Sequence, residues 1–181
     1  MRLFIGIALS PAVIAELATL TARLRSKADS LRWTEPESWH ITLQFVGSTS
    51  QEKIDCLLAR LSELRFPPVP VRIEELGIFD RAGVFFAGIT LTPELVSLKQ
   101  RIAAALSLCG FVPEIHPFRP HITLARAKGE ARVHALRTLG ARIQPRPTFT
   151  RFIAREFLLY ESYLSAAGSL YVIRARFSLT S

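Results

Sequence analysis

One tetrapeptide, His-Ile-Thr-Leu, occurs twice in the 181-residue chain, over residues 40–43 and 121–124. Each copy lies in a stretch that predicts a β-strand, over 39–46 and 121–127. Because side chains alternate between the two faces of a strand, His and Thr share one face, and Ile and Leu share the other. Two such strands brought together would place two imidazoles and two hydroxyls around one small volume.

Helix signals recur around the two copies in the same order. Ser10-Pro11 and Thr92-Pro93 each predict a helix start, with an N-cap hydroxyl followed by a first-turn proline. Thr49 and Glu52 have the spacing of a capping box, and Gly110 is a C-terminal cap for the third long helix. A weaker helix is predicted over roughly 131–139. Each His strand therefore lies between two predicted helices.

The strand pattern completes the repeat. Further extended segments are predicted over 3–8, 71–79, 84–89, 152–160 and 170–179. The first half reads β-α-β-α-β-β and the second α-β-α-β-β, which predicts a duplicated α+β fold. We expect a single two-lobed domain over 1–181, with approximate lobes 1–90 and 91–181 and one His strand in each. The alternative is one mixed sheet in which the repeated tetrapeptide is coincidental.

Charge and cysteine content narrow the partners and the compartment. The net charge is +8, carried mostly by arginine, which suits bidentate phosphate contacts and favours an anionic partner such as nucleic acid. A basic protein without such a partner would have the same composition. Cys56 and Cys109 lie among apolar residues of predicted helices, which predicts buried free thiols and a reducing compartment. No apolar run is long enough for a membrane span, so we expect a cytoplasmic monomer with no membrane contact.

The chain resembles the bacterial and archaeal RNA 2′,3′-cyclic phosphodiesterases, also called 2′-5′ RNA ligases, of the two-histidine phosphoesterase superfamily. The resemblance is carried by 2–7, 40–47, 120–126, 159–162 and 168–171, nearly from end to end. It implies a bilobal α+β fold with pseudo-two-fold symmetry, in which two antiparallel-rich sheets flank a central cleft and helices cover the outer faces. It implies metal-independent hydrolysis of 2′,3′-cyclic phosphate ends to 2′-phosphomonoesters, with no cofactor, and a reversible 2′-5′ joining reaction.

The resemblance also assigns the site residues. They are His40 and His121 as catalytic residues and Thr42, Thr123, Arg126 and Phe45 as substrate-binding residues. Phe45 would be a base-stacking wall, and Arg126 a phosphate or substrate contact. The chain departs from the family at Trp39, where Leu is common, and in the apolar segment over 83–88, which leaves the base preference open.

Two imidazoles and two hydroxyls suit the opening of a cyclic phosphodiester. One group must take a proton from water and another must give one to the leaving ribose oxygen, and an unperturbed imidazole can do either near neutral pH. The two hydroxyls can donate to the non-bridging phosphate oxygens. By resemblance His40 would be the acid for the 3′-oxygen and His121 the base for water, although the identical motifs leave this order open. The partner would be RNA with 2′,3′-cyclic phosphate ends, or a cyclic nucleotide.

Several other residues are candidates for the same site. His116 is predicted in a loop at the cleft rim and His134 on the solvent face of a helix, with no third ligand for a metal. Trp33, Trp39 and Tyr171 are further stacking candidates that could equally belong to the core. Phe45 itself lies five residues after His40, so strand alternation turns it away from the cleft unless a bulge intervenes. A non-catalytic nucleotide- or RNA-binding module that uses the same cleft is the alternative function.

Overall fold

The structure is a computed structural model that describes residues 2–25, 31–112, 114–127, 132–141, 143, 147–165 and 168–180. Its helices are α1 (Pro11–Leu24), the 3-10 helix η1 (Pro36–Ser38), α2 (Gln51–Glu63), α3 (Pro93–Leu108) and α4 (Arg132–Ala141). Its strands are β1 (Arg2–Ala8), β2 (Leu31–Trp33), β3 (His40–Gly47), β4 (Val69–Val71), β5 (Ile73–Phe79), β6 (Val84–Ile89), β7 (His121–Ala127), β8 (Phe152–Ala154), β9 (Glu156–Ser165) and β10 (Gly168–Ser178).

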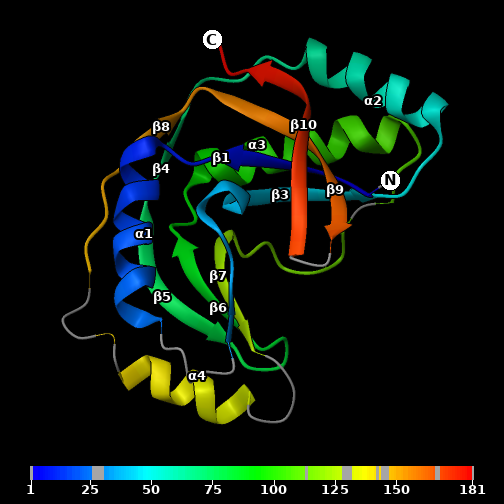
Figure 1. Ribbon diagram of the computed structural model, residues 1–181. Helices are drawn as coiled ribbons and strands as arrows, with labels where there is room; N and C mark the ends of the chain where they lie inside the picture. Colours follow the sequence, from blue (N-terminus) through cyan, green and yellow to red (C-terminus); the bar gives the residue numbers. More distant parts are fainter. Residues whose placement is uncertain are drawn as a thin grey trace.

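The strands form two four-stranded antiparallel sheets and one short strand pair (Figure 1). The first sheet has the order β10-β9-β1-β3, the second has the order β2-β7-β6-β5, and β4 pairs with β8. In the view of Figure 1, α2 and α3 lie toward the first sheet, and α1 and α4 toward the second. The predicted α+β class with antiparallel sheets is confirmed, and each large sheet contains one of the two His strands.

The sheets do not follow the two halves of the sequence. The first sheet joins β1 and β3 to the C-terminal hairpin β9–β10, and the second joins β7 to three strands from the first half. The proposed lobe boundaries, 1–90 and 91–181, therefore do not coincide with the sheets. Strand periodicity indicates which face of a strand is buried, but it does not indicate which edge the strand pairs with. Apolar side chains from both sheets pack into one connected core.

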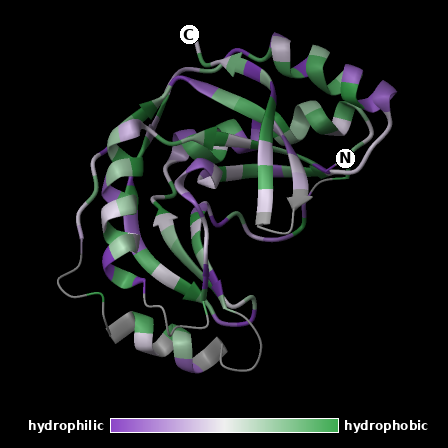
Figure 2. Ribbon diagram, viewed as in Figure 1, coloured by the Kyte–Doolittle hydropathy of each residue, from purple (hydrophilic) through white to green (hydrophobic). Residues whose placement is uncertain are grey.

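The predicted helix caps are found with one shift of register. The hydroxyls of Ser10 and Thr92 accept hydrogen bonds from the first turns of α1 and α3. In α2 the N-cap is Ser50, one residue after the predicted Thr49. Gly110 follows α3 with a φ of 74°. The backbone N–H groups of Gly110 and Phe111 donate to the carbonyls of Ser107 and Leu106, which forms a Schellman motif. Figure 2 shows hydrophobic residues concentrated on the strands and mixed with hydrophilic ones along the helices, as expected for helices with one solvent face.

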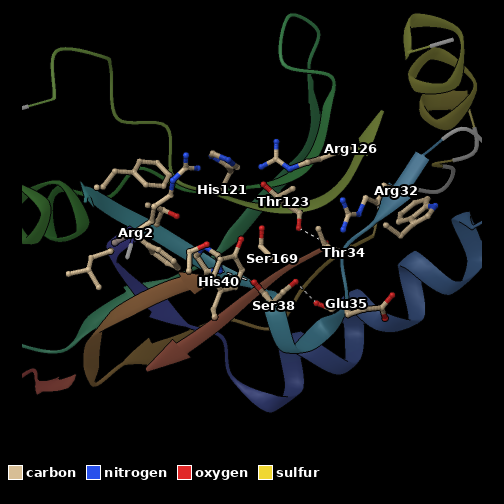
Figure 3. A pocket seen from close by; sticks show the side chains of 18 residues that line it. Arg2, Arg32, Thr34, Glu35, Ser38, His40, His121, Thr123, Arg126 and Ser169 are labelled. Carbon is tan, nitrogen blue, oxygen red and sulfur yellow. Dashed lines mark hydrogen bonds between the residues drawn. The ribbon is translucent and has the colours of Figure 1, made fainter. Parts of the chain in front are cut away.

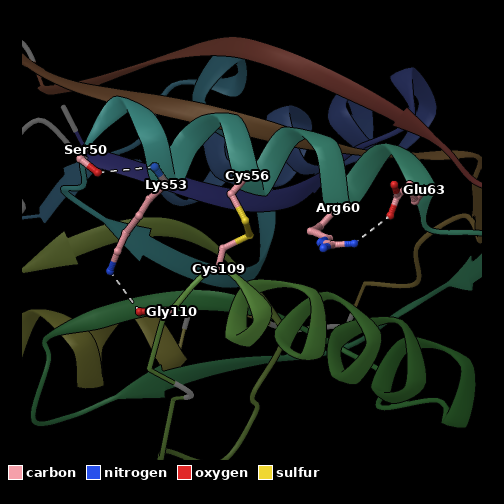
Figure 4. The surroundings of a disulfide bond; sticks show 7 residues. All are labelled: Ser50, Lys53, Cys56, Arg60, Glu63, Cys109 and Gly110. Atoms are coloured by element: carbon pink, nitrogen blue, oxygen red, sulfur yellow. Dashed lines mark hydrogen bonds and ion pairs between the residues drawn. A yellow bond between two sulfur atoms is a disulfide. The ribbon is translucent and has the colours of Figure 1, made fainter.

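The two cysteines form a disulfide, so the predicted free thiols are wrong. Cys56 lies in the middle of α2 and Cys109 caps the end of α3, and their Cα atoms are 5.8 Å apart (Figure 4). Close by, the Lys53 ammonium donates to the Gly110 carbonyl at 3.1 Å. The two cysteines are 53 residues apart in the sequence, and nothing in the sequence indicated that α2 and α3 pack together. Because the free thiols were one reason to expect a reducing compartment, the cytoplasmic location stays a prediction without that support.

None of the helices in the described ranges is long and apolar enough to span a bilayer.

Reduction of the disulfide is expected to lower the free energy of unfolding by about 2–4 kcal/mol, because the bond limits the freedom of the unfolded chain. Urea denaturation with and without dithiothreitol measures this. The control is the double variant Cys56→Ala/Cys109→Ala, whose stability should not respond to reductant. Two titratable thiols in the oxidised, unfolded wild type would contradict the pairing.

Candidate active site

The two His strands meet although they belong to different sheets. Cα atoms of β3 and β7 lie within 8 Å of one another. Both strands line one pocket of about 490 Å³. Its lining includes all six residues that the sequence singled out, namely His40, Thr42, Phe45, His121, Thr123 and Arg126. Figure 3 shows the two histidines in the middle of the pocket, with Arg2 toward one end and Arg32 and Arg126 toward the other.

A β-bulge explains how Phe45 reaches this pocket. In the pairing of β1 with β3, Ile5 opposes Gln44 and Gly6 opposes Thr42, so Leu43 has no partner. Leu43 and Gln44 are consequently both buried, and the alternation restarts with the opposite phase. Phe45, 63% exposed, therefore returns to the face of His40.

The same bulge occurs in β7. Phe85 of β6 opposes Ala125 and Phe86 opposes Thr123, so Leu124 is unpaired. The burial pattern of the first seven residues is the same in both His strands, with two consecutive buried residues before an exposed one. Arg126 thus occupies the position relative to His121 that Phe45 occupies relative to His40. The duplication extends beyond the tetrapeptide to the backbone irregularity that follows it.

Each imidazole is held by the backbone just before its strand. The Nδ1 of His40 lies 2.7 Å from the carbonyl oxygen of Ser38, and the Nδ1 of His121 lies 2.7 Å from that of Arg119. A carbonyl oxygen can only accept, so Nδ1 carries the proton in both rings. In the neutral state Nε2 then bears the lone pair and can act as a base. When the ring is protonated, Nε2–H can donate as an acid.

The two rings have different surroundings. His40 packs among aromatic rings, with centroids 4.6 Å from Phe4, 4.8 Å from Tyr171 and 5.7 Å from Tyr160. The centroid of His121 lies 5.0 Å from Phe79 and 5.6 Å from Phe86. Gly6 lets β1 approach β3 closely beside His40, because a Cβ there would lie 2.7 Å from the Ile41 carbonyl oxygen.

Burial lowers the pKa of both histidines. The pKa of His40 falls to about 4, chiefly through desolvation, and repulsion from His121 adds to the effect. The pKa of His121 is lowered by desolvation and further by the positive charge of Arg126. In each ring the Nδ1 bond to the backbone partly opposes the shift. Both imidazoles are thus predominantly neutral at pH 7 in the ligand-free pocket.

The other sequence candidates separate into pocket and core. Trp33 and Tyr171 line the pocket, whereas Trp39 is 5% exposed and belongs to the core. The Trp39 indole donates to the Thr34 hydroxyl at 2.8 Å. His116 is exposed in the loop after α3 without lining the pocket, and His134 is exposed on α4, as predicted for a solvent-facing residue.

Several pocket residues escaped the sequence analysis. They include Arg2, Phe4, Arg32, Ser162 and Ser169. Their strands, β1, β2, β9 and β10, reach the pocket only through pairings that the sequence did not specify. The resemblance of residues 2–7 to the family pointed to the segment that contains Arg2 and Phe4, but it assigned neither residue to the site. Within the part of the chain that the structure describes, no three His, Cys, Asp or Glu side chains gather as metal ligands.

Comparison with known families matches most of the chain. The model of the LigT-like phosphoesterases matches it twice, over residues 7–86 and 90–171. Each match contains one His-Ile-Thr-Leu tetrapeptide, which agrees with the repeat seen in the sequence.

Related proteins and structures match from two thirds to nearly all of the chain. An RNA 2′,3′-cyclic phosphodiesterase of Aeropyrum pernix is 32% identical over 68% of this chain and 73% of its own. That of Escherichia coli K12 is 28% identical over 99% and 97%. The crystal structure of E. coli LigT complexed with 3′-AMP has a TM-score of 0.81 at 24% identity, covering 99% of this chain and 98% of that one. A Thermus thermophilus structure has a TM-score of 0.78 at 26% identity, covering the same shares.

The hydrogen bonds and pKa shifts predict the titration of the two rings. Ring ¹⁵N NMR should show the Nδ1–H tautomer for both at neutral pH, with His40 titrating near pH 4. The same rings should titrate near about 6.5 in urea. Inorganic phosphate should raise both pKa values in the folded protein, because an anion favours the imidazolium. Predominant Nε2–H tautomers, or a folded His40 titrating at its unfolded value, would contradict the geometry.

Proposed function

The chain belongs to the LigT-like phosphoesterase family, and on that premise we propose that it hydrolyses the 2′,3′-cyclic phosphate ends of RNA or nucleotides to 2′-phosphomonoesters. His40 and His121 act as a paired acid and base, and no metal takes part. One observation carries the proposal. Both imidazoles, each held through Nδ1 with Nε2 left for a ligand, line one pocket together with both threonine side chains. The shared name of the relatives supports the substrate class.

The reaction balances with the groups present. The oxygen of water forms a bond to phosphorus, and the bond from phosphorus to the ribose 3′-oxygen breaks. Nε2 of His121 takes a proton from the water, and Nε2–H of His40 gives one to the 3′-oxygen. Because burial lowers the pKa of His40 to about 4, the bound phosphate anion must raise it before His40 can act as the acid.

The remaining pocket residues bind rather than transfer protons. The hydroxyls of Thr42 and Thr123 donate to the non-bridging oxygens, where negative charge increases in the transition state. The Arg126 guanidinium adds a charge-assisted contact to a phosphate of the substrate. Phe45, turned into the pocket by the bulge, offers its ring to a base.

The same pocket can carry out the joining reaction in one step. If the 5′-hydroxyl of a second RNA replaces water, its oxygen forms the bond to phosphorus and the 3′-oxygen leaves as before. The product is a 2′-5′ phosphodiester beside a free 3′-hydroxyl, and the step can run in reverse. The proposal includes that the protein is a monomer and that it acts on RNA ends in the cytoplasm.

The alternative is a non-catalytic RNA- or nucleotide-binding module. Binding alone would need the positive charge and the aromatic rings of the pocket, but it would not need two imidazoles in the same tautomer beside two hydroxyls. Turnover of a cyclic nucleotide separates the two functions.

Substitution of the four motif residues tests the paired mechanism. His40→Ala and His121→Ala should each lower turnover of a 2′,3′-cyclic nucleotide by about 100- to 10,000-fold. The double variant should be little worse, because groups that act as one unit are non-additive. Thr42→Ala and Thr123→Ala should lose roughly 10- to 100-fold, since each removes one hydrogen bond to a charged group.

The five variants and the wild type are compared with and without excess EDTA, and circular dichroism checks that each is folded. A folded His variant with near wild-type turnover would refute the acid–base pair. Loss of wild-type activity in EDTA would refute metal independence.

The dependence of rate on pH follows from the lowered pKa values. Catalysis needs one neutral and one protonated imidazole, so kcat/KM should be bell-shaped, with limbs that belong to the coupled pair. Because the pKa of each ring is lowered in the ligand-free pocket, the optimum of kcat/KM should lie below about pH 6.5. The optimum of kcat should lie higher, because bound phosphate favours the imidazolium. A kcat/KM that keeps rising above pH 7 would contradict this account.

A further inference from the structure

Two arginines lie side by side at one end of the pocket. Arg32 of β2 and Arg126 of β7 are direct partners in the antiparallel register, and both are exposed and line the pocket. Direct partners in an antiparallel pair point to the same face, where opposite charges stabilise and like charges destabilise. Strand pairing therefore holds the positive charges of Arg32 and Arg126 next to each other, although they repel.

No carboxylate within the described ranges neutralises this pair. Glu35 is the acidic residue of the pocket lining, and its carboxylate is bound at 3.2 Å to Arg25, outside the lining. Neither Arg32 nor Arg126 forms an ion pair in the described part of the chain. The charge of Arg126 extends as far as His121, whose pKa it helps to lower. Two adjacent guanidiniums at this end of the pocket make a site for an anion.

The backbone fixes this site at a distance from the motif hydroxyls. The Thr34 hydroxyl lies 2.8 Å from the Thr123 carbonyl oxygen, so Thr34, the residue after β2, is level with the motif on β7. Arg32 is two residues further along β2, which is about 6.8 Å along an ideal strand. Arg32 thus lies beyond the volume that the two imidazoles and the two threonines surround, whereas Arg126 lies nearer to His121 and Thr123 (Figure 3).

The shape of a ribonucleotide suggests which anion reaches this position. In a terminal ribose, C2′ and C3′ carry the cyclic phosphate, while the base on C1′ and the 5′-phosphate chain on C4′ leave from opposite sides. Phe45 is the partner of Phe4 on β1, and Tyr171 is level with Arg2 through Ser162, so both belong to the first sheet. The arginine pair belongs to the second sheet. With the cyclic phosphate at the histidines and the base toward Phe45, the 5′ side of the nucleotide points to Arg32 and Arg126.

We propose that Arg32 and Arg126 together bind the phosphodiester on the 5′ side of the terminal nucleotide, so that the pocket selects an RNA 3′ end over a free cyclic mononucleotide. This rests on the proposed function, because it places the cyclic phosphate between the two histidines. Arg32 is the residue that should distinguish an RNA 3′ end from a free cyclic mononucleotide. Arg126 is less selective, because it also lies close enough to act on His121.

The test measures binding, so that it does not depend on turnover. The ligands are a nucleoside 2′-phosphate, the dinucleotide ending in the same nucleoside 2′-phosphate, and that dinucleotide with a neutral methylphosphonate linkage. The wild type should bind the charged dinucleotide about tenfold more tightly than either of the other two, as expected for a charge-assisted contact. Arg32→Gln should remove this preference, and the two changes, in linkage and in protein, should not be additive.

The matched control is Arg101→Gln, which removes the same charge from an exposed position on α3 and should keep the preference. Arg32→Gln should unfold at the same or a higher temperature than the wild type, because it relieves the repulsion. An equal loss for all three ligands, or a preference that survives in Arg32→Gln, would overturn the proposal. Hydrolysis of the matching cyclic phosphates, measured in parallel, reports separately on the proposed function, since that function can fail while the binding preference persists.

Discussion

The hydrogen bond from each imidazole Nδ1 to the carbonyl two residues before it is the contact on which the site depends. It places each histidine at the first residue of its strand, with the ring held against the preceding backbone. It also selects one tautomer, so that both rings offer the same nitrogen to a ligand. Because the bond is made to backbone, the exchange of neighbouring side chains leaves it in place. The repeat therefore gives two equivalent groups to one pocket, and the differences between them come from the rings around each.

Those surroundings follow from an exchange of strands between the two halves. The C-terminal hairpin pairs with β1 and brings Tyr160 and Tyr171 to His40, and the β5–β6 hairpin brings Phe79 and Phe86 to His121. The aromatic side of His40 is the drier one, which accounts for its strongly lowered pKa. Because burial favours the neutral form of His40 in the ligand-free pocket, its role as the acid depends on the bound phosphate, which raises its pKa.

Local features of this fold could be predicted from the sequence, and long-range features could not. Ser10-Pro11 and Thr92-Pro93 marked two helix starts because capping is a contact within a few residues. The two His strands were recognisable from alternation and repetition. The Cys56–Cys109 bond, the partners of β1 and β7, and the contribution of Arg32 depend on residues far apart in the chain. Phe45 shows where local prediction ends. Strand alternation predicted that it faces away from His40, but Leu43 is unpaired in the register with β1, and this bulge returns Phe45 to the face of His40.

The central claim is that the two imidazoles open a cyclic phosphodiester by moving protons in opposite directions. The most direct measurement is ³¹P NMR of a 2′,3′-cyclic nucleotide incubated with the protein in excess chelator. The account predicts that the cyclic phosphate signal is replaced by that of the nucleoside 2′-phosphate alone, because the acid protonates the 3′-oxygen. An unchanged cyclic phosphate, or a product that carries its phosphate on the 3′-oxygen, would contradict it.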